Sequence, residues 1–231
     1  MVIKLKKVFK RFECKYIISK DQAIEMEKYI LEYIPKDIYP SGTIQSLYYD
    51  TPNYQLIRKS IEKPLYKEKI RIRTYEIPND QSNVFLELKK KSEKIVFKRR
   101  VELSYADATN FFINDNVILE GQIGREIHYF KKFYQNLIPS FLIIYDRKAY
   151  CDYNLDLRIT FDNNIRFRTN DLSLNNERTG ELILDEDKVL LEIKTCGGYP
   201  MWLCKYLSEN KIYKTSFSKY GIAYKKLILG R

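Results

Sequence analysis

Apolar and charged residues alternate along much of the chain with a period of two, the pattern of β-strands that bury one face. The stretch KEKIRIRTYE places Lys69, Arg71 and Arg73 on one face and Ile70 and Ile72 on the other. The same alternation predicts eight strands, over residues 9–18, 44–50, 68–76, 84–91, 95–103, 141–150, 157–162 and 188–195. Each strand therefore has a charged face and a mostly apolar face.

Segments with helical spacing lie between these strands. Ser19 and Gln22 form a capping-box signature, and Pro35 should end the helix that follows. We expect this helix to bury the face formed by Ile24, Tyr29, Ile30 and Ile34. The predicted helices cover residues 21–34, 105–113, 125–137, 201–209 and 219–229, whereas the polar, turn-rich residues 169–187 predict a loop.

Length and composition narrow the class of protein. The 231 residues, 45% of them hydrophobic, suit one domain over residues 1–231 with a substantial core. No segment resembles a signal peptide or a membrane span, and the four cysteines form no CxxC pair, so we expect a cytoplasmic protein without a zinc site. The formal charge of +11 favours polyanionic partners.

The charged strand faces have two explanations. An antiparallel sheet can turn such faces to water. Alternatively, the strands close into a barrel whose interior collects the cations, and the interior then needs water or a ligand because unpaired buried charges are costly. A linear polyphosphate suits that interior, and its carboxylates could hold Mg²⁺ or Mn²⁺.

Several motifs together resemble the VTC domain, the polyphosphate polymerase branch of the triphosphate tunnel metalloenzymes. In chain order they are RFECKYII, LYYDTPNYQLI, KIRIRTY, FLELKKK, FKRRVEL, YDRKAY, LRITFDNNI, LLEIKT with YPMWL, and SFSKYG. The resemblance implies an α+β fold, namely an eight-stranded antiparallel β tunnel with helices packed outside. It also implies transfer of the γ-phosphate of ATP to a growing polyphosphate chain.

The resemblance also implies the site residues. Its phosphate-binding positions correspond to Lys15, Arg58, Arg71, Arg73, Lys98, Arg147, Arg158 and Lys219. Glu192 falls where the family holds its divalent metal, Mn²⁺ or Mg²⁺, and it joins Arg71, Arg73 and Arg158 as the implied catalytic set. Alternation alone places Lys89 and Lys194 on the same interior face.

The first strand departs from the wider superfamily, whose hydrolases and cyclases begin with ExExK. This chain has Arg11, Glu13 and Lys15 at those alternate positions. The cation at the first position removes a candidate metal ligand and adds affinity for phosphate.

Two other functions stay open: a triphosphate or nucleoside triphosphate hydrolase of the same fold, and a non-catalytic module that binds polyanions. We expect ATP and polyphosphate as partners rather than a specific nucleic acid, and a membrane-bound partner protein stays open as an alternative.

Overall fold

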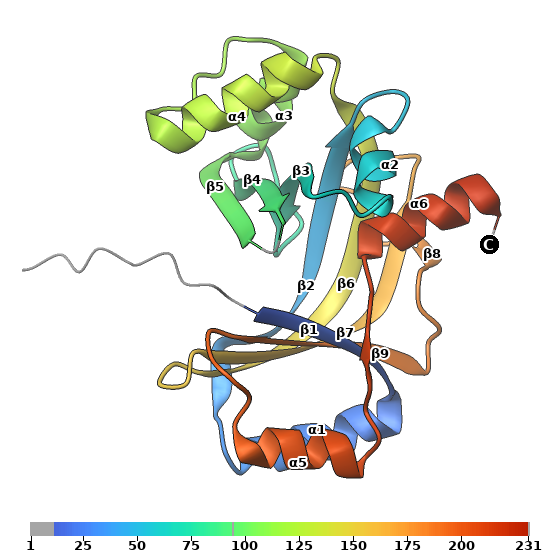
Figure 1. The fold of residues 1–231 in the computed structure, drawn as a ribbon. Helices are drawn as coiled ribbons and strands as arrows, with labels where there is room; N and C mark the ends of the chain where they lie inside the picture. Colours follow the sequence, from blue (N-terminus) through green and yellow to red (C-terminus); the bar gives the residue numbers. More distant parts are fainter. Residues whose placement is uncertain (1–11, 94, 231) are drawn as a thin grey trace, which may run out of the picture. The chain divides into compact units, whose positions relative to one another are not determined.

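The computed structural model describes residues 12–93 and 95–230 (Figure 1). The strands are β1 (Phe12–Ser19), β2 (Lys36–Asp50), β3 (Tyr66–Thr74), β4 (Asn83–Ser92), β5 (Ile95–Ser104), β6 (Ile138–Asp152), β7 (Leu157–Arg168), β8 (Glu181–Leu182), β9 (Lys188–Thr195) and β10 (Lys214–Thr215). The helices are α1 (Lys20–Leu31), α2 (Gln55–Ile61), α3 (Tyr105–Ile113), α4 (Gly121–Tyr134), α5 (Met201–Glu209) and α6 (Lys219–Leu229).

Strand pairing follows the order β10-β1-β9-β7-β6-β2-β3-β4-β5, with β8 beside β7. All eight predicted strands are present, although residues 9–11 of the first lie outside the described part of the chain. The predicted count of eight is too low for the described residues. The additional strands β8 and β10 have two residues each, too few to produce a period. No helix within residues 12–93 and 95–230 has both the length and the apolar character needed to span a membrane.

The helix predictions need correction at α1, α2 and α4. Helix α4 covers Gly121–Tyr134 instead of the predicted residues 125–137. Helix α1 ends at Leu31, before Pro35, and it buries Ala23, Met26 and Ile30 while Ile24 is 52% exposed. The predicted face was wrong at Ile24: the buried residues Ala23, Met26 and Ile30 follow a spacing of i, i+3 and i+7, and Ile24 lies about 100° around the helix from Ala23. Helix α2 was not predicted, since its seven residues are too few for a clear helical pattern.

Spatial contacts divide the chain into two compact units. The first unit contains the described residues up to Gly42 together with Arg147–Asn163 and Leu184–Phe217. The second unit contains Thr43–Asp146, Asn164–Ile183 and the described residues from Ser218 onward.

In the first unit, antiparallel β1, β9 and β7 present an apolar face to α1 and α5 (Figure 1). Buried strand residues such as Ile18 and Leu191 meet Met26 of α1 and Leu203 of α5 in one core. The capping box of Ser19 and Gln22 begins α1 as predicted. Because the apolar side chains point toward the helices, the alternate charged side chains of β1 and β9 share the opposite face.

In the second unit, β2, β3, β4 and β5 form antiparallel neighbours whose apolar face meets α3 and α4. Ile70, Ile72 and Leu86 are fully buried there with Phe111 and Ile127 of the helices. This packing leaves the row of arginines on β3 on the other face, as the alternation predicts.

Asp50 connects the end of β2 to α2. Its carboxylate accepts hydrogen bonds from the backbone N–H groups of Leu56 (2.8 Å) and Ile57 (3.0 Å), and from the Tyr220 hydroxyl of α6 (2.8 Å). The carboxylate therefore caps the positive N-terminal end of α2, where helix N–H groups lack partners within the helix. Its complete burial makes these bonds important for stability.

We expect Asp50→Ala to lower the free energy of unfolding by about 3 kcal/mol, because it leaves buried backbone donors without an acceptor. Tyr220→Phe removes a single hydrogen bond to the same carboxylate and should cost about 1 kcal/mol. Urea denaturation followed by circular dichroism measures both. Equal losses for the two variants would contradict the capping role.

Candidate phosphate-binding and metal site

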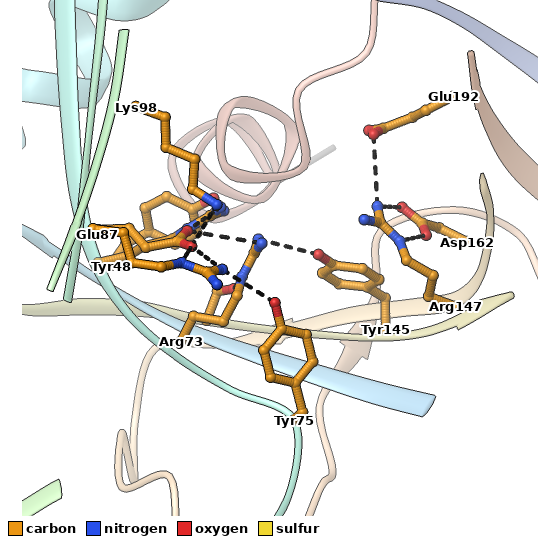
Figure 2. Close-up of polar contacts among 12 residues, drawn as sticks. Tyr48, Arg73, Tyr75, Glu87, Lys98, Tyr145, Arg147, Asp162 and Glu192 are labelled. Atoms are coloured by element: carbon orange, nitrogen blue, oxygen red, sulfur yellow. Dashed lines mark hydrogen bonds and ion pairs between the residues drawn. The ribbon is translucent and has the colours of Figure 1, made fainter. Parts of the chain in front are cut away.

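The second unit contains a buried carboxylate surrounded by cations, here called the Glu87 cluster. It consists of Glu87, Arg71, Arg73, Lys98 and Arg100. Figure 2 labels Glu87, Arg73 and Lys98 of this cluster. Glu87 of β4 lies directly opposite Arg71 on β3 and Arg100 on β5. The strand register therefore places one arginine on each side of Glu87, which is 2% exposed.

Glu87 divides its oxygens among these cations. Arg71 Nη2 lies 2.7 Å from Oε2, while Lys98 Nζ and Arg100 Nε both lie 2.8 Å from Oε1. Arg73 is more distant, at 3.7 Å from Oε2. Four cations against one carboxylate leave the cluster with a net positive charge.

Neutral side chains orient two of the arginines. The Arg71 guanidinium donates to the Tyr48 hydroxyl (2.7 Å), and Arg73 donates to Ser46 and Tyr145 (3.2 Å each). These bonds fix the planar guanidinium groups without neutralising them. Such fixed, charged donors suit phosphate groups, because one guanidinium can donate two parallel hydrogen bonds to two phosphate oxygens.

The cluster also shifts pKa values. Burial disfavours the charge of Glu87, but Arg71, Arg73 and Lys98 outweigh burial and hold its pKa far below the usual carboxyl value. Burial lowers the pKa of Lys98 to about 8; the attraction of Glu87 opposes this shift, and repulsion from Arg100 and Arg73 adds to it. Glu87 is thus ionised at neutral pH, whereas Lys98 titrates near the pH at which most enzymes work.

The first unit contains a second group, the Glu192 cluster, composed of Glu13, Lys15, Arg147, Asp162, Glu192 and Lys194. In the β1–β9 register, Lys15 lies opposite Glu192 and Glu13 lies opposite Lys194. Arg147 binds Asp162 with two nitrogens, and its Nη2 lies 3.6 Å from Glu192 (Figure 2). Three cations and three carboxylates make this cluster formally neutral.

The predicted site residues divide between the two units. Arg71, Arg73 and Lys98 belong to the Glu87 cluster, and in the same unit the Lys219 ammonium lies 4.4 Å from the ring centre of Tyr145. Lys15, Arg147 and Glu192 belong to the Glu192 cluster. A single tunnel lined by both clusters depends on how the units are placed and stays a prediction.

Two cations that the sequence predicts for the site, Arg158 and Arg58, belong to neither cluster. Arg158 of β7 pairs with Asp37 at 2.8 Å, although the register places it opposite Lys194. Arg58 is exposed on α2 and forms no ion pair within the described part of the chain. Arg11, expected on the same face as Glu13, falls outside the described residues.

Four residues of these clusters had no predicted phosphate or metal role: Glu13, Glu87, Arg100 and Asp162. Tyr145, which accepts a hydrogen bond from Arg73, was not singled out either. The period of two places these residues on the same strand faces as predicted site residues. Arg100 and Asp162 lie two and four residues from the predicted Lys98 and Arg158, and Tyr145 lies two residues before Arg147. The alternation assigned Glu13 and Glu87 to the interior face and aligned Arg100 with Lys98 and Asp162 with Arg158, but only positions that match the family motifs received a phosphate or metal role.

The carboxylates offer a limited metal site. The residues that the structure describes contain no group of three or more acidic, histidine or cysteine side chains able to hold a metal. Glu192 and Glu13 supply oxygen ligands, which hard cations such as Mg²⁺ prefer, and Mg²⁺ commonly uses one or two carboxylates together with substrate phosphates and water. The Lys15 and Lys194 ammonium groups already lie between these two carboxylates, so positive charge fits there.

Comparisons with known proteins agree with the predicted fold. The model of the VTC domain family matches residues 10–228, and no curated protein sequence matches. An adenylate cyclase-like protein of Bacillus halodurans is 12% identical, with 92% of this chain and 94% of that chain covered and a TM-score of 0.57. One from Vibrio parahaemolyticus is 11% identical, with coverages of 94% and 99% and a TM-score of 0.50. The recognition of the family and the predicted tunnel fold class are confirmed, with more than eight strands.

We expect Glu87→Gln to lower the melting temperature at low ionic strength, because four cations then lose their shared counterion. Inorganic tripolyphosphate should raise the melting temperature of the variant more than that of the wild type, since bound ligand stabilises the native state and now relieves a larger repulsion. Thermal unfolding by differential scanning fluorimetry measures both effects.

Glu186→Gln, in the exposed loop before β9, is the matched control and should behave as the wild type. An unchanged melting temperature for Glu87→Gln, or equal rescue by citrate, would contradict a phosphate-binding role for the cluster.

Proposed function

Because this chain belongs to the VTC domain family, we propose that it is a polyphosphate polymerase that uses ATP and a divalent metal, Mn²⁺ or Mg²⁺. The proposed reaction transfers the γ-phosphate of ATP to the end of a polyphosphate chain. The proposed phosphate-binding residues are Lys15, Arg58, Arg71, Arg73, Lys98, Arg147, Arg158 and Lys219, with Glu192 as metal ligand.

One observation carries this proposal, namely the excess positive charge of the Glu87 cluster. Arg71 and Arg73 have hydrogen bonds to neutral side chains that hold their guanidinium groups in place, but a single carboxylate serves all four cations. A triphosphate supplies several anionic oxygens and compensates this excess. The cluster thus suits a chain of phosphates better than a singly charged ligand.

Phosphoryl transfer requires mainly alignment and neutralisation of charge. A terminal oxygen of the acceptor forms a bond to the γ-phosphorus while the bond from that phosphorus to the bridging oxygen breaks, and ADP leaves. The acceptor oxygen is already anionic near neutral pH, so no side chain has to remove a proton. We assign Arg71 and Arg73 to hold the triphosphate oxygens and to offset the charge of the transition state.

Glu192, with Glu13 beside it, would hold the metal. The bound ion would supply positive charge shared between phosphate oxygens and so help to neutralise and align them. Arg147 contacts Glu192 and is held by Asp162, so we assign it to orient this carboxylate and to bind phosphate.

A hydrolase of the same fold is the second candidate, because the net positive Glu87 cluster would bind a triphosphate equally well if water were the attacking group. Water would then replace the acceptor phosphate, and free phosphate would be the product. Product analysis distinguishes the two reactions, since only the polymerase makes long chains from ATP.

We expect Glu192→Gln to abolish Mn²⁺-dependent polymer synthesis while tripolyphosphate binding without metal stays equal or becomes stronger, because an anion has been removed. Arg73→Ala should weaken that binding by about 1 to 3 kcal/mol, the value of a lost charge-assisted contact. Calorimetry measures binding, and gel electrophoresis of products measures synthesis.

Arg125→Ala, on the exposed face of α4, serves as the control for removal of one arginine and should bind as the wild type. Polymer synthesis by Glu192→Gln at the wild-type rate would remove the assigned metal role. A wild type that makes no polymer, with or without a phosphate primer, would overturn the proposed function.

The pKa of Lys98 adds a pH dependence. Bound phosphate favours the protonated amine and raises this pKa above its ligand-free value of about 8, so the complex holds more protons than the free protein just above pH 8. Tripolyphosphate affinity should therefore fall as pH rises through 8 to 10. Lys98→Arg should remove this fall in affinity because arginine stays charged. If the affinity of that variant falls equally with pH, another group is responsible for the pH dependence.

A further inference from the structure

Both oxygens of Glu192 are engaged by lysine. Lys15 Nζ lies 3.4 Å from Oε1, and Lys194 Nζ lies 3.2 Å from Oε2. The same two lysines contact Glu13, at 3.3 Å and 3.8 Å. Two ammonium groups and two carboxylates thus alternate across β1 and β9, and the Glu192 side chain is only 7% exposed.

The two lysines differ in what holds them. Lys15 also donates to the backbone carbonyl of Phe217 at 2.9 Å, which fixes its position independently of the carboxylates. Within the described residues, the contacts of the Lys194 ammonium are to Glu13 and Glu192, and its side chain is 28% exposed. Lys194 is therefore the cation that can leave at lower cost.

We propose that Lys194 is the internal counterion of the metal position and that a divalent cation must displace it from Glu192. This inference rests on the proposed function only in taking Glu192 as the metal ligand. A divalent ion and an ammonium group repel each other and compete for the same oxygen. The ligand-free protein consequently binds the metal weakly.

The displaced ammonium needs a new anion. A lysine on a flexible four-carbon stem can move to a nearby phosphate oxygen, where it contributes a point charge. Phosphate and metal therefore bind cooperatively, because the phosphate receives the amine that the metal releases. Lys194 acts as a positioning residue that couples the two ligands.

The test measures Mn²⁺ binding to the full chain without nucleotide or phosphate, by calorimetry and by the electron paramagnetic resonance signal of free Mn²⁺. Lys194→Met should bind Mn²⁺ at least about tenfold more tightly than the wild type, as expected for removal of a unit charge a few ångströms away at a partly buried site. Lys194→Arg keeps the charge and should bind as weakly as the wild type.

Lys188→Met is the matched control. Lys188 lies on the same strand, pairs with Asp187, and its removal changes the net charge equally. The double variant Lys194→Met with Glu192→Gln should lose the gain in affinity, which assigns the bound ion to Glu192. Lys194→Gln provides a polar second variant should Lys194→Met fold poorly.

Unchanged or weaker Mn²⁺ binding in folded Lys194→Met or Lys194→Gln would overturn the counterion role, as would an equal gain in Lys188→Met. These measurements need no turnover, so they separate this inference from the proposed function. A protein that makes no polymer but shows the tenfold gain would support the inference alone.

Discussion

The buried carboxylate of Glu87 is the constraint on which the second unit depends. An ionised side chain with 2% exposure requires compensating charge, and the strand register supplies Arg71 and Arg100 on either side. The compensation exceeds what one carboxylate needs. The fold therefore tolerates an excess of positive charge. Under the proposed function a phosphate chain would neutralise this excess, and the stability of this sheet face would then depend on ligand binding.

The two clusters distribute charge in different ways. The Glu87 cluster has four cations to one anion, whereas the Glu192 cluster has three of each. The unbalanced group suits the attraction of a polyanion from solution. The balanced group suits exchange, because one cation can replace another at a carboxylate without a large change in net charge. The proposed reaction needs both properties, one for the phosphate chain and one for the metal.

Much of this arrangement could be predicted from alternation alone. All eight long strands, and the charged faces of β3, β4 and β9, follow from the period of two in the sequence. Partners across strands could not be predicted in the same way, because a pairing such as Lys15 with Glu192 depends on register between segments far apart in the chain. Which face of α1 packs on the sheet, with Ala23 buried and Ile24 exposed, likewise depends on tertiary contacts.

Helix α2 and its cap illustrate a different limit. Its short sequence has little helical pattern of its own, and the helix is held by the carboxylate of Asp50, which lies outside it. Tertiary contacts therefore decide the local structure there. The motif LYYDT supplied the right residues, but its sequence alone did not indicate that one carboxylate would serve both a helix terminus and the Tyr220 hydroxyl.

The same carboxylate also affects the conformational entropy that ligand binding would cost at Arg71. Asp50 holds the hydroxyl of Tyr220, whose ring stacks on Tyr48 with ring centres 4.4 Å apart, and the Tyr48 hydroxyl accepts a bond from Arg71. These contacts restrict the Arg71 rotamers before any ligand arrives. Ordering a long, free side chain would otherwise reduce the affinity. Under the proposed function, Arg71 would thus meet an incoming anion with its guanidinium group already ordered.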